Sequence, residues 1–152
     1  MKLTLKCAAA TVILFLCSPA PVVAGPFEDA AAAYNKGDYA TALRLLRPLA
    51  HQGDAAARYN LGLMYAAGQG VPQDYAEAVK WYRLAANQGY AYAQYNLGLV
   101  YGEGKDEPIP QNETEAIKWY RLAANQGQAR AQNNLAVMYH YGRACRKAML
   151  KH

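Results

Sequence analysis

The sequence predicts an all-α fold built from helix pairs that stack side by side. The first observation is a repeat, since "WYRLAANQG" occurs from Trp81 to Gly89 and again, unchanged, from Trp119 to Gly127. The second is that apolar residues recur at intervals of three and four around it, as in amphipathic helices. The third is a set of capping residues and glycines that mark helix ends. One pair cannot bury its own apolar face, so stacked pairs form a continuous core.

The first two dozen residues read as an export signal. Two lysines open the chain, an uncharged apolar run extends from Cys7 to Cys17, and small residues lead to Ala24, after which we place the cleavage site. The run is about half of the ~20 residues that span a bilayer, so a removed signal is expected rather than a retained membrane helix. Bulky Leu16 argues against a lipid on Cys17. The sequence therefore predicts a periplasmic or secreted protein with no membrane span after cleavage of residues 1–24.

The residues after Ala24 form one domain, 25–152, with a nearly neutral body. Two of the three cysteines belong to the signal, so a single thiol, Cys145, remains and no disulfide framework is possible. The domain holds 14 basic and 11 acidic residues, and four of the basic ones lie in the last ten positions. Without those four the charge is close to zero. This balance removes the electrostatic case for nucleic-acid binding.

The repeat units follow one another along this domain. A shift of 36 residues aligns "DYATALRLLRPLAHQG" from Asp38 with "DYAEAVKWYRLAANQG" from Asp74. "ARYNLGLMY" from Ala57 recurs from Ala93 and, in the form "AQNNLAVMY", from Ala131. The units are a partial repeat at 27–53, full repeats at 55–89 and 91–127, and an incomplete repeat at 129–152. Each unit is two helical segments with a loop, which gives about seven helices plus a short C-terminal piece.

Local signals mark the ends of the second helix in each pair. Side chains suited to N-capping precede its first turn at Asp38, Asp74 and Asn112. Glutamates follow two of these caps at the third position, Glu77 and Glu115, as in a capping box. The expected stops are the glycines Gly53, Gly89 and Gly127.

The first helix of each pair carries a buried stripe and an unexpected glycine. In the first full unit the stripe is Ala57, Leu61, Met64 and Tyr65. A glycine follows Leu61 and its counterpart Leu97, although glycine inside a helix costs ~1 kcal/mol relative to alanine. We expect a neighbouring helix to approach closely at both glycines.

These residues carry a resemblance to a known family. The pattern A-x-x-x-L-G-x-x-Y-x-x-G-x-G-V-P-x-D-Y-x-x-A-x-x-W-Y-x-x-A-A-x-x-G, from Ala57 to Gly89, resembles the Sel-one-like repeat (SLR), a relative of the tetratricopeptide repeat. The resemblance implies antiparallel helix pairs in a right-handed solenoid, and a role as an adaptor that holds other proteins together. The positions that match the repeat structurally are Leu61, Gly62, Tyr65, Trp81, Leu97, Gly98, Tyr101, Trp119, Leu135 and Tyr139.

The resemblance places the partner-binding groove on the concave surface, which the first helix of each pair lines. The side of these helices away from the core is apolar or aromatic where solvent would favour charge. Leu61 and Leu63 lie about 200° apart on a helical wheel, so one core face does not easily absorb both. The predicted groove residues are Tyr59, Leu63, Tyr92, Tyr95, Leu99, Arg130, Asn133, Val137 and His140. The alternative is that these tyrosines only pack between units.

Other conspicuous residues are interpreted as structural. Trp81 and Trp119 occupy one repeat position, so we expect packing rather than stacking on a ligand. The acidic loop with Glu103, Asp106 and Glu107 lacks the regular ligand spacing of a calcium site, so we expect a solvated loop and no metal. The sequon at Asn112 is better interpreted as a helix cap.

No catalytic residue and no cofactor is predicted. The domain offers Cys145 and three histidines without the spacing of a catalytic or metal site, although His140 is five residues from the cysteine. Two alternatives to the adaptor remain: a peptidoglycan- or glycan-binding envelope protein that uses the groove aromatics, and a penicillin-recognising hydrolase. Penicillin binding has been proposed for a cysteine-rich branch of the family with paired cysteines in each repeat, and this chain has no such pairs.

The last unit contains a first helix but no second helix. From Gly142, the last residue of "AQNNLAVMYHYG", the chain reads "GRACRKAMLKH", without the loop or the tryptophan of the other units. The segment from Ala144 to Leu150 could fold back over the apolar face of Leu135, Met138 and Tyr139, but it is too short to replace a helix of about fourteen residues. We expect a copy of the protein or another partner to cover that face by association, or else the chain to be a truncated member of its family.

Overall fold

The computed structural model describes residues 25–103 and 110–149, which form helices and no strand. The helices are α1 (Pro26–Asn35), α2 (Tyr39–Gln52), α3 (Ala55–Ala67), α4 (Tyr75–Ala86), α5 (Ala91–Glu103), α6 (Glu113–Asn125) and α7 (Ala129–Met149). We call α1, α3, α5 and α7 the A helices and α2, α4 and α6 the B helices.

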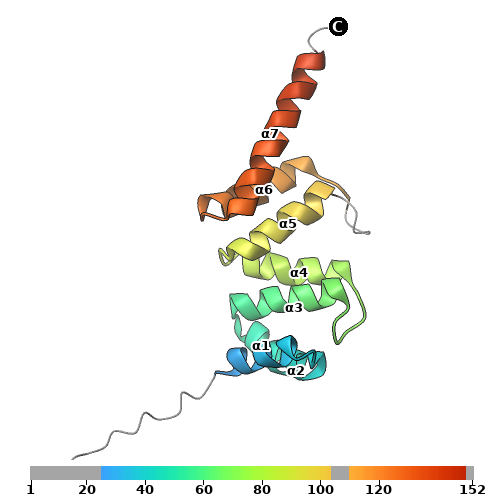
Figure 1. Cartoon of the computed structure of the whole chain (residues 1–152), viewed down its shortest axis with the longest axis vertical. Coiled ribbons are helices and arrows are strands. Elements are labelled where there is room, and N and C mark those ends of the chain that lie inside the picture. The colour runs from blue at the N-terminus through green and yellow to red at the C-terminus, as the bar shows by residue number, and fades with distance from the viewer. Residues whose placement is uncertain (1–24, 104–109, 150–152) are drawn as a thin grey trace, which may run out of the picture.

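The helices stack in chain order. Each packs chiefly against the helix before it and the helix after it, and Figure 1 shows one column that runs from α1 to the projecting end of α7. Two hydrophobic clusters fill the column, one between α1 and α4 and the other from α4 to α7. The predicted all-α solenoid of helix pairs is thus confirmed.

The predicted N-caps of the B helices are present. A side-chain oxygen accepts the N–H of the third helical residue at Asp38 (3.0 Å), Asp74 (2.9 Å) and Asn112 (3.1 Å). Asp54, which the sequence analysis did not single out, caps α3 in the same way at 2.7 Å from the Ala57 N–H. Gly53, Gly89 and Gly127 follow the B helices with positive φ, as glycines at helix ends commonly do.

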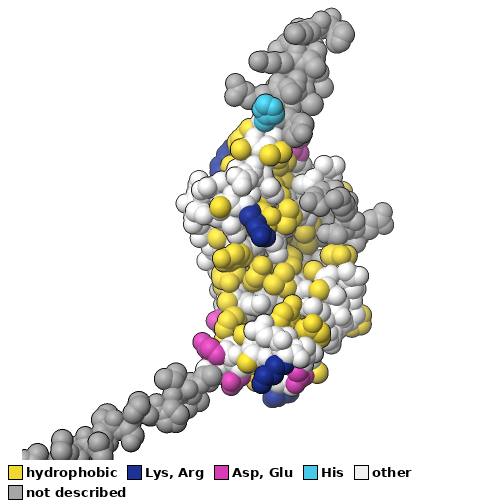
Figure 2. Space-filling model, viewed as in Figure 1, with side chains coloured by type: hydrophobic (Ala, Val, Ile, Leu, Met, Phe, Trp, Pro, Cys, Tyr) yellow, Lys and Arg dark blue, Asp and Glu magenta, His cyan; other side chains and the backbone are white. Residues whose placement is uncertain are grey.

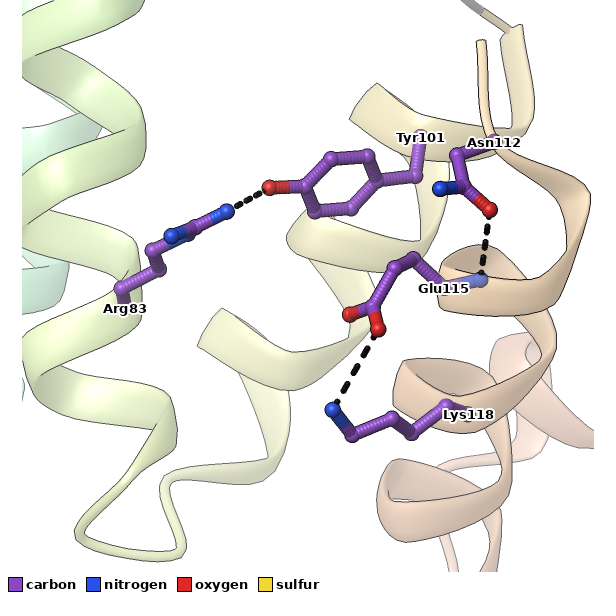
Figure 3. A network of polar contacts seen from close by, with 5 residues as sticks. All are labelled: Arg83, Tyr101, Asn112, Glu115 and Lys118. Carbon is purple, nitrogen blue, oxygen red and sulfur yellow. Dashed lines mark hydrogen bonds and ion pairs between the residues drawn. The ribbon is translucent and has the colours of Figure 1, made fainter.

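The capping boxes are only half formed. The N–H of each cap residue, Asp74 or Asn112, donates instead to a carbonyl at the end of the preceding A helix, Tyr65 or Tyr101. The glutamates are therefore free to pair with lysines: Glu77 with Lys80 at 2.7 Å and Glu115 with Lys118 at 3.4 Å. Figure 3 shows the second of these pairs beside the Asn112 cap and the contact of Arg83 with Tyr101.

A close approach explains the glycines inside α3 and α5. A Cβ atom at Gly62 would lie 2.5 Å from the Tyr82 ring, and one at Gly98 would lie 2.4 Å from the Tyr120 ring. Helices α3 and α5 therefore each expose their backbone to a tyrosine ring of the B helix that follows. In α7 the same position is Ala136, which is exposed.

Polar links between consecutive pairs also repeat. The side chain at one A-helix position donates to the carbonyl near the end of the preceding B helix: Arg58 to Ala50 (2.9 Å), Gln94 to Ala86 (3.1 Å) and Gln132 to Ala124 (3.1 Å). Because α7 makes this link too, its first half is docked as a regular A helix.

The C-terminal segment does not fold back. Helix α7 continues without a break to Met149, so within the described residues the segment from Ala144 extends the helix and does not fold back over the last unit. The loop glycine and proline of the other units are Ala144 and Arg146 here, and neither residue breaks a helix. On the face of α7 that the other units cover with a B helix, Leu135 and Met138 are half-buried and Tyr139 is 39% exposed.

Two predicted segments lie outside the described residues: the signal at 1–24 and the acidic loop, of which 104–109 and the Glu103 side chain are not described. Among the described helices, none combines the length and the apolar character that crossing a bilayer requires.

Candidate functional site

Three hollows recur at the same place in successive units. Each lies where an A helix, its B helix and the next A helix meet. Three equivalent positions line all of them: Ala30, Leu46 and Asn60 in hollow 1; Ala66, Tyr82 and Asn96 in hollow 2; Gly102, Tyr120 and Asn134 in hollow 3. Their volumes are about 220, 150 and 160 Å³ respectively. Among the residues that the structure describes, no charged side chain lines any of the three, so they suit uncharged groups.

An asparagine sits in the wall of each hollow. Asn60 donates to the Ala56 carbonyl at 2.8 Å, and Asn134 donates to the Tyr120 hydroxyl at 3.1 Å. An amide side chain offers both donors and an acceptor, which are the groups that bind a peptide main chain. These asparagines were not predicted as site residues, although they recur in the sequence in "YNLG", "YNLG" and "NNLA".

A cluster of tyrosines lies beside hollow 2. The Tyr59 ring centroid is 5.9 Å from that of Tyr82, 5.3 Å from Tyr90 and 6.1 Å from Tyr92. Burial raises the pKa of the Tyr59 phenol, the neighbouring Tyr90 raises it further, and a hydrogen bond with Asn96 works in the opposite direction. The phenol therefore stays neutral at physiological pH and remains able to donate a hydrogen bond.

The predicted groove residues divide by exposure. Half-buried side chains that pack against the core are Tyr59, Leu63, Tyr95 and Leu99. Exposed ones are Tyr92, Arg130, Asn133, Val137 and His140. Tyr92 is 56% exposed and Val137 is 52% exposed, so both offer apolar surface to solvent. Leu99 and Val137 also line hollows 2 and 3.

The half-buried tyrosines therefore pack against neighbouring helices with one part of the ring and leave the rest of the ring at the surface. Tyr95 lies 6.0 Å from Tyr120, centroid to centroid, as Tyr59 lies beside Tyr82. Inter-unit packing, the alternative interpretation, accounts for part of each ring. It accounts less well for Tyr92, which is 56% exposed although its ring lies beside those of Tyr59 and Tyr90.

The tryptophans pack inside the stack. Trp119 is buried beneath Lys118, whose Nζ lies 5.3 Å from the ring centroid. Trp81 is half-buried and meets His51 edge-on at 5.6 Å. Both indole N–H groups are buried without a hydrogen-bond partner in the described part of the chain. Neither lines one of the hollows.

No metal-binding group of three or more His, Cys, Asp or Glu side chains occurs within residues 25–103 and 110–149. His140 is exposed, and the side chain of Cys145 lies outside the described set. The hollows and the exposed A-helix residues beside them are therefore the candidate site.

The family model for the Sel1 repeat matches residues 55–90, 91–128 and 129–148. Among solved structures, a Sel1 repeat protein from Oxalobacter formigenes is 36% identical, with a TM-score of 0.72, over 76% of this chain and 47% of the relative. A protective antigen of uropathogenic Escherichia coli strains with an SLR fold is 41% identical, with a TM-score of 0.71, over 77% of this chain and 26% of that protein. This chain thus spans less than half the length of either. No curated protein matches it.

Proposed function

Because the chain belongs to the Sel1 repeat family, we propose that it is an exported, non-enzymatic scaffold that holds a protein or peptide partner along its A helices. Proteins with Sel1 repeats generally mediate interactions between proteins. The observation that carries the proposal is the row of uncharged hollows with exposed Tyr92 and Val137 beside them. Large aromatic and apolar side chains of this kind are common anchors at protein interfaces.

Export is supported by the signal pattern in residues 1–24 and places the protein in the periplasm or outside the cell. The mass of the protein recovered from the cell envelope tests this. A chain that begins at Gly25 agrees with export, whereas a full-length chain found only in the cytoplasm contradicts it.

A non-enzymatic role is supported by the scarcity of catalytic residue types in the domain. A penicillin-recognising hydrolase would have to work without paired cysteines. Turnover of a chromogenic lactam that survives both Cys145→Ala and His140→Ala would contradict the scaffold proposal, because it would require a catalytic site that neither residue provides.

Photo-crosslinking from single positions tests the scaffold itself. A benzoylphenylalanine at Tyr92 or at Val137 reports on the A-helix surface, and one at Leu84 or Leu122 is the matched control on the B helices. These controls are 44% and 40% exposed, so all four probes reach solvent. We expect protein adducts from envelope extract at the first two positions only.

The other outcomes are also informative. Adducts that form equally from Leu84 and Leu122 would move the interface to the B helices. Retention on purified peptidoglycan, with no protein adduct from any position, would favour the glycan-binding alternative. Adducts with a second copy of the chain would make self-association the function of this surface.

A further inference from the structure

Hollow 1 differs from hollows 2 and 3 in the residue that limits its size. The B helix contributes Leu46 to hollow 1 and a tyrosine, Tyr82 or Tyr120, to the others. The phenol rings of those tyrosines cover the backbone of the A helix at Gly62 and Gly98, within the space between the two helices. Without a ring at position 46, hollow 1 encloses about 220 Å³ rather than 150 or 160 Å³.

The lining of hollow 1 restricts the chemistry of what fills it. Phe27, Ala31 and Leu46 contribute carbon surface, and Tyr34, Asn35 and Asn60 are polar but uncharged. The Tyr34 hydroxyl already donates to Gln69 at 2.7 Å. Burial of a charged group here would lack an opposite charge and would be costly. The occupant is therefore uncharged and bulky.

We propose that hollow 1 is the anchor pocket of the groove and takes one large apolar side chain, such as leucine, methionine or phenylalanine, from an extended peptide segment of the partner. Hollows 2 and 3, which the rings of Tyr82 and Tyr120 line, offer less space, about 150 and 160 Å³. The inference rests on the proposed function, because it assumes that a polypeptide lies along the A helices.

The charge at the rim adds a second element to the expected peptide. Glu28, Ala31 and Asn35 follow one another at intervals of three and four, so they share a face of α1, and the last two line hollow 1. Glu28 and Asp29 are both exposed in the first turn, and no basic residue occupies the last turn. Figure 2 shows acidic side chains at this end of the molecule, with Lys and Arg side chains close by. A basic residue next to the anchor side chain complements this rim.

Capped amino acids test the pocket without the partner. We would titrate N-acetyl-leucine methylamide and N-acetyl-alanine methylamide into the ¹⁵N-labelled full chain and follow amide shifts. We expect shifts centred on Ala31, Asn35 and Asn60, and at least tenfold tighter binding of the leucine probe, because burial of its larger side chain contributes more than 1.4 kcal/mol. Equal binding of both probes, or shifts centred on hollows 2 and 3, would overturn the proposal.

Two matched variants locate the effect. Ala31→Phe fills hollow 1 from an exposed position, and Ala67→Phe places the same ring at the equivalent exposed position of α3. We expect the first to abolish binding of the leucine probe and the second to leave it unchanged. A probe that still binds to Ala31→Phe with its original affinity does not occupy hollow 1, which would contradict the inference.

Two dipeptides test the rim. N-acetyl-Leu-Lys-amide should bind several-fold tighter than N-acetyl-Leu-Glu-amide at low salt, and the difference should vanish in Glu28→Gln or at 1 M salt. No preference in the unmodified protein would remove the basic neighbour from the proposal. Because no probe requires the partner, a failed titration with successful crosslinking at Tyr92 would refute the anchor pocket alone. The reverse pattern would refute the proposed function alone.

Discussion

The A helices and the B helices of the full units share a core but differ in the surface that they show. Helices α3 and α5 contain one charged residue each, Arg58 and Glu103. Arg58 serves packing, since its Nε donates to the Ala50 carbonyl. In contrast, α4 contains three charged residues and α6 contains four, with an ion pair on each. The B helices therefore form the solvated side of the stack.

This difference concerns exposed apolar side chains that folding of the stack does not require. An exposed position on a stacked helix can hold a charged residue, as Lys80 and Arg83 show on α4. The A helices hold Tyr92 and Val137 instead, each more than half exposed. Binding of a partner, as proposed above, would give a reason for apolar residues that are this exposed. The predictions below separate residues that build the stack from those that face a partner.

The largest expected effect comes from a core residue of an A helix. Leu97 is fully buried, so Leu97→Ala should lower the free energy of unfolding by about 2–5 kcal/mol through lost burial and a cavity. Leu84→Ala, on the outer side of α4, should cost less than about 1 kcal/mol. Urea unfolding followed by circular dichroism measures both. Equal losses would mean that the two sides of the stack are not distinct.

The next effect tests the close approach of A and B helices. Gly98→Ala should destabilise by about 1–3 kcal/mol, because the new methyl group meets the Tyr120 ring. If only helix propensity mattered, replacing this glycine by alanine would instead raise the free energy of unfolding by about 1 kcal/mol. The same urea assay on Gly98→Ala combined with Tyr120→Leu should show most of the loss recovered. A stabilised Gly98→Ala single variant would show that the two helices are not held together at this glycine.

A smaller effect is expected at the start of a B helix. Asp74→Ala removes the acceptor of the Glu77 N–H and should cost about 1 kcal/mol. Asp74→Asn retains a capping oxygen, as Asn112 does in the next unit, and should stay within a few tenths of a kcal/mol of the original protein. Thermal unfolding measures the stability of both variants. If both variants lost the same stability, the capping role of the Asp74 side chain would be contradicted.

The smallest effect belongs to the solvated pairs of the B helices. Glu115→Gln breaks the ion pair with Lys118, whose side chain is 58% exposed. The expected change in unfolding free energy is below about 0.5 kcal/mol and should shrink further in high salt. A loss above about 2 kcal/mol would indicate that this surface is not solvated.

The repeat architecture could be predicted from the sequence because its signals are local. Helical periodicity, N-caps and glycines lie within one helix and its neighbour, and adjacent units repeat the same environment. The glycines in α3 and α5 even predicted a close helix contact from their helix-breaking tendency alone. The formation of half a capping box was not predictable, because the competing acceptors, the carbonyls of Tyr65 and Tyr101, belong to another helix.

The hollows and the end of α7 were less accessible to sequence reasoning. A hollow depends on three helices at once, so the effect of Leu46 in place of a tyrosine is visible only after the helices are packed. The continuation of α7 through Ala144 was not predicted, because the residues after Gly142 were interpreted as a separate short piece. The groove list mixed half-buried Tyr59 and Tyr95 with exposed Tyr92, since wheel angles do not show which rings meet a neighbouring unit.

The central claim is that the A helices keep an apolar surface for a partner and not for the fold. The free energy of unfolding of the double variant Tyr92→Ser with Val137→Ser tests it most directly, because no partner is needed. We predict a loss of no more than about 1 kcal/mol, the scale of the surface ring contacts that Tyr92 makes with Tyr59 and Tyr90. A loss of about 3 kcal/mol or more, typical of a core truncation, would show that these residues hold the units together and would contradict the account.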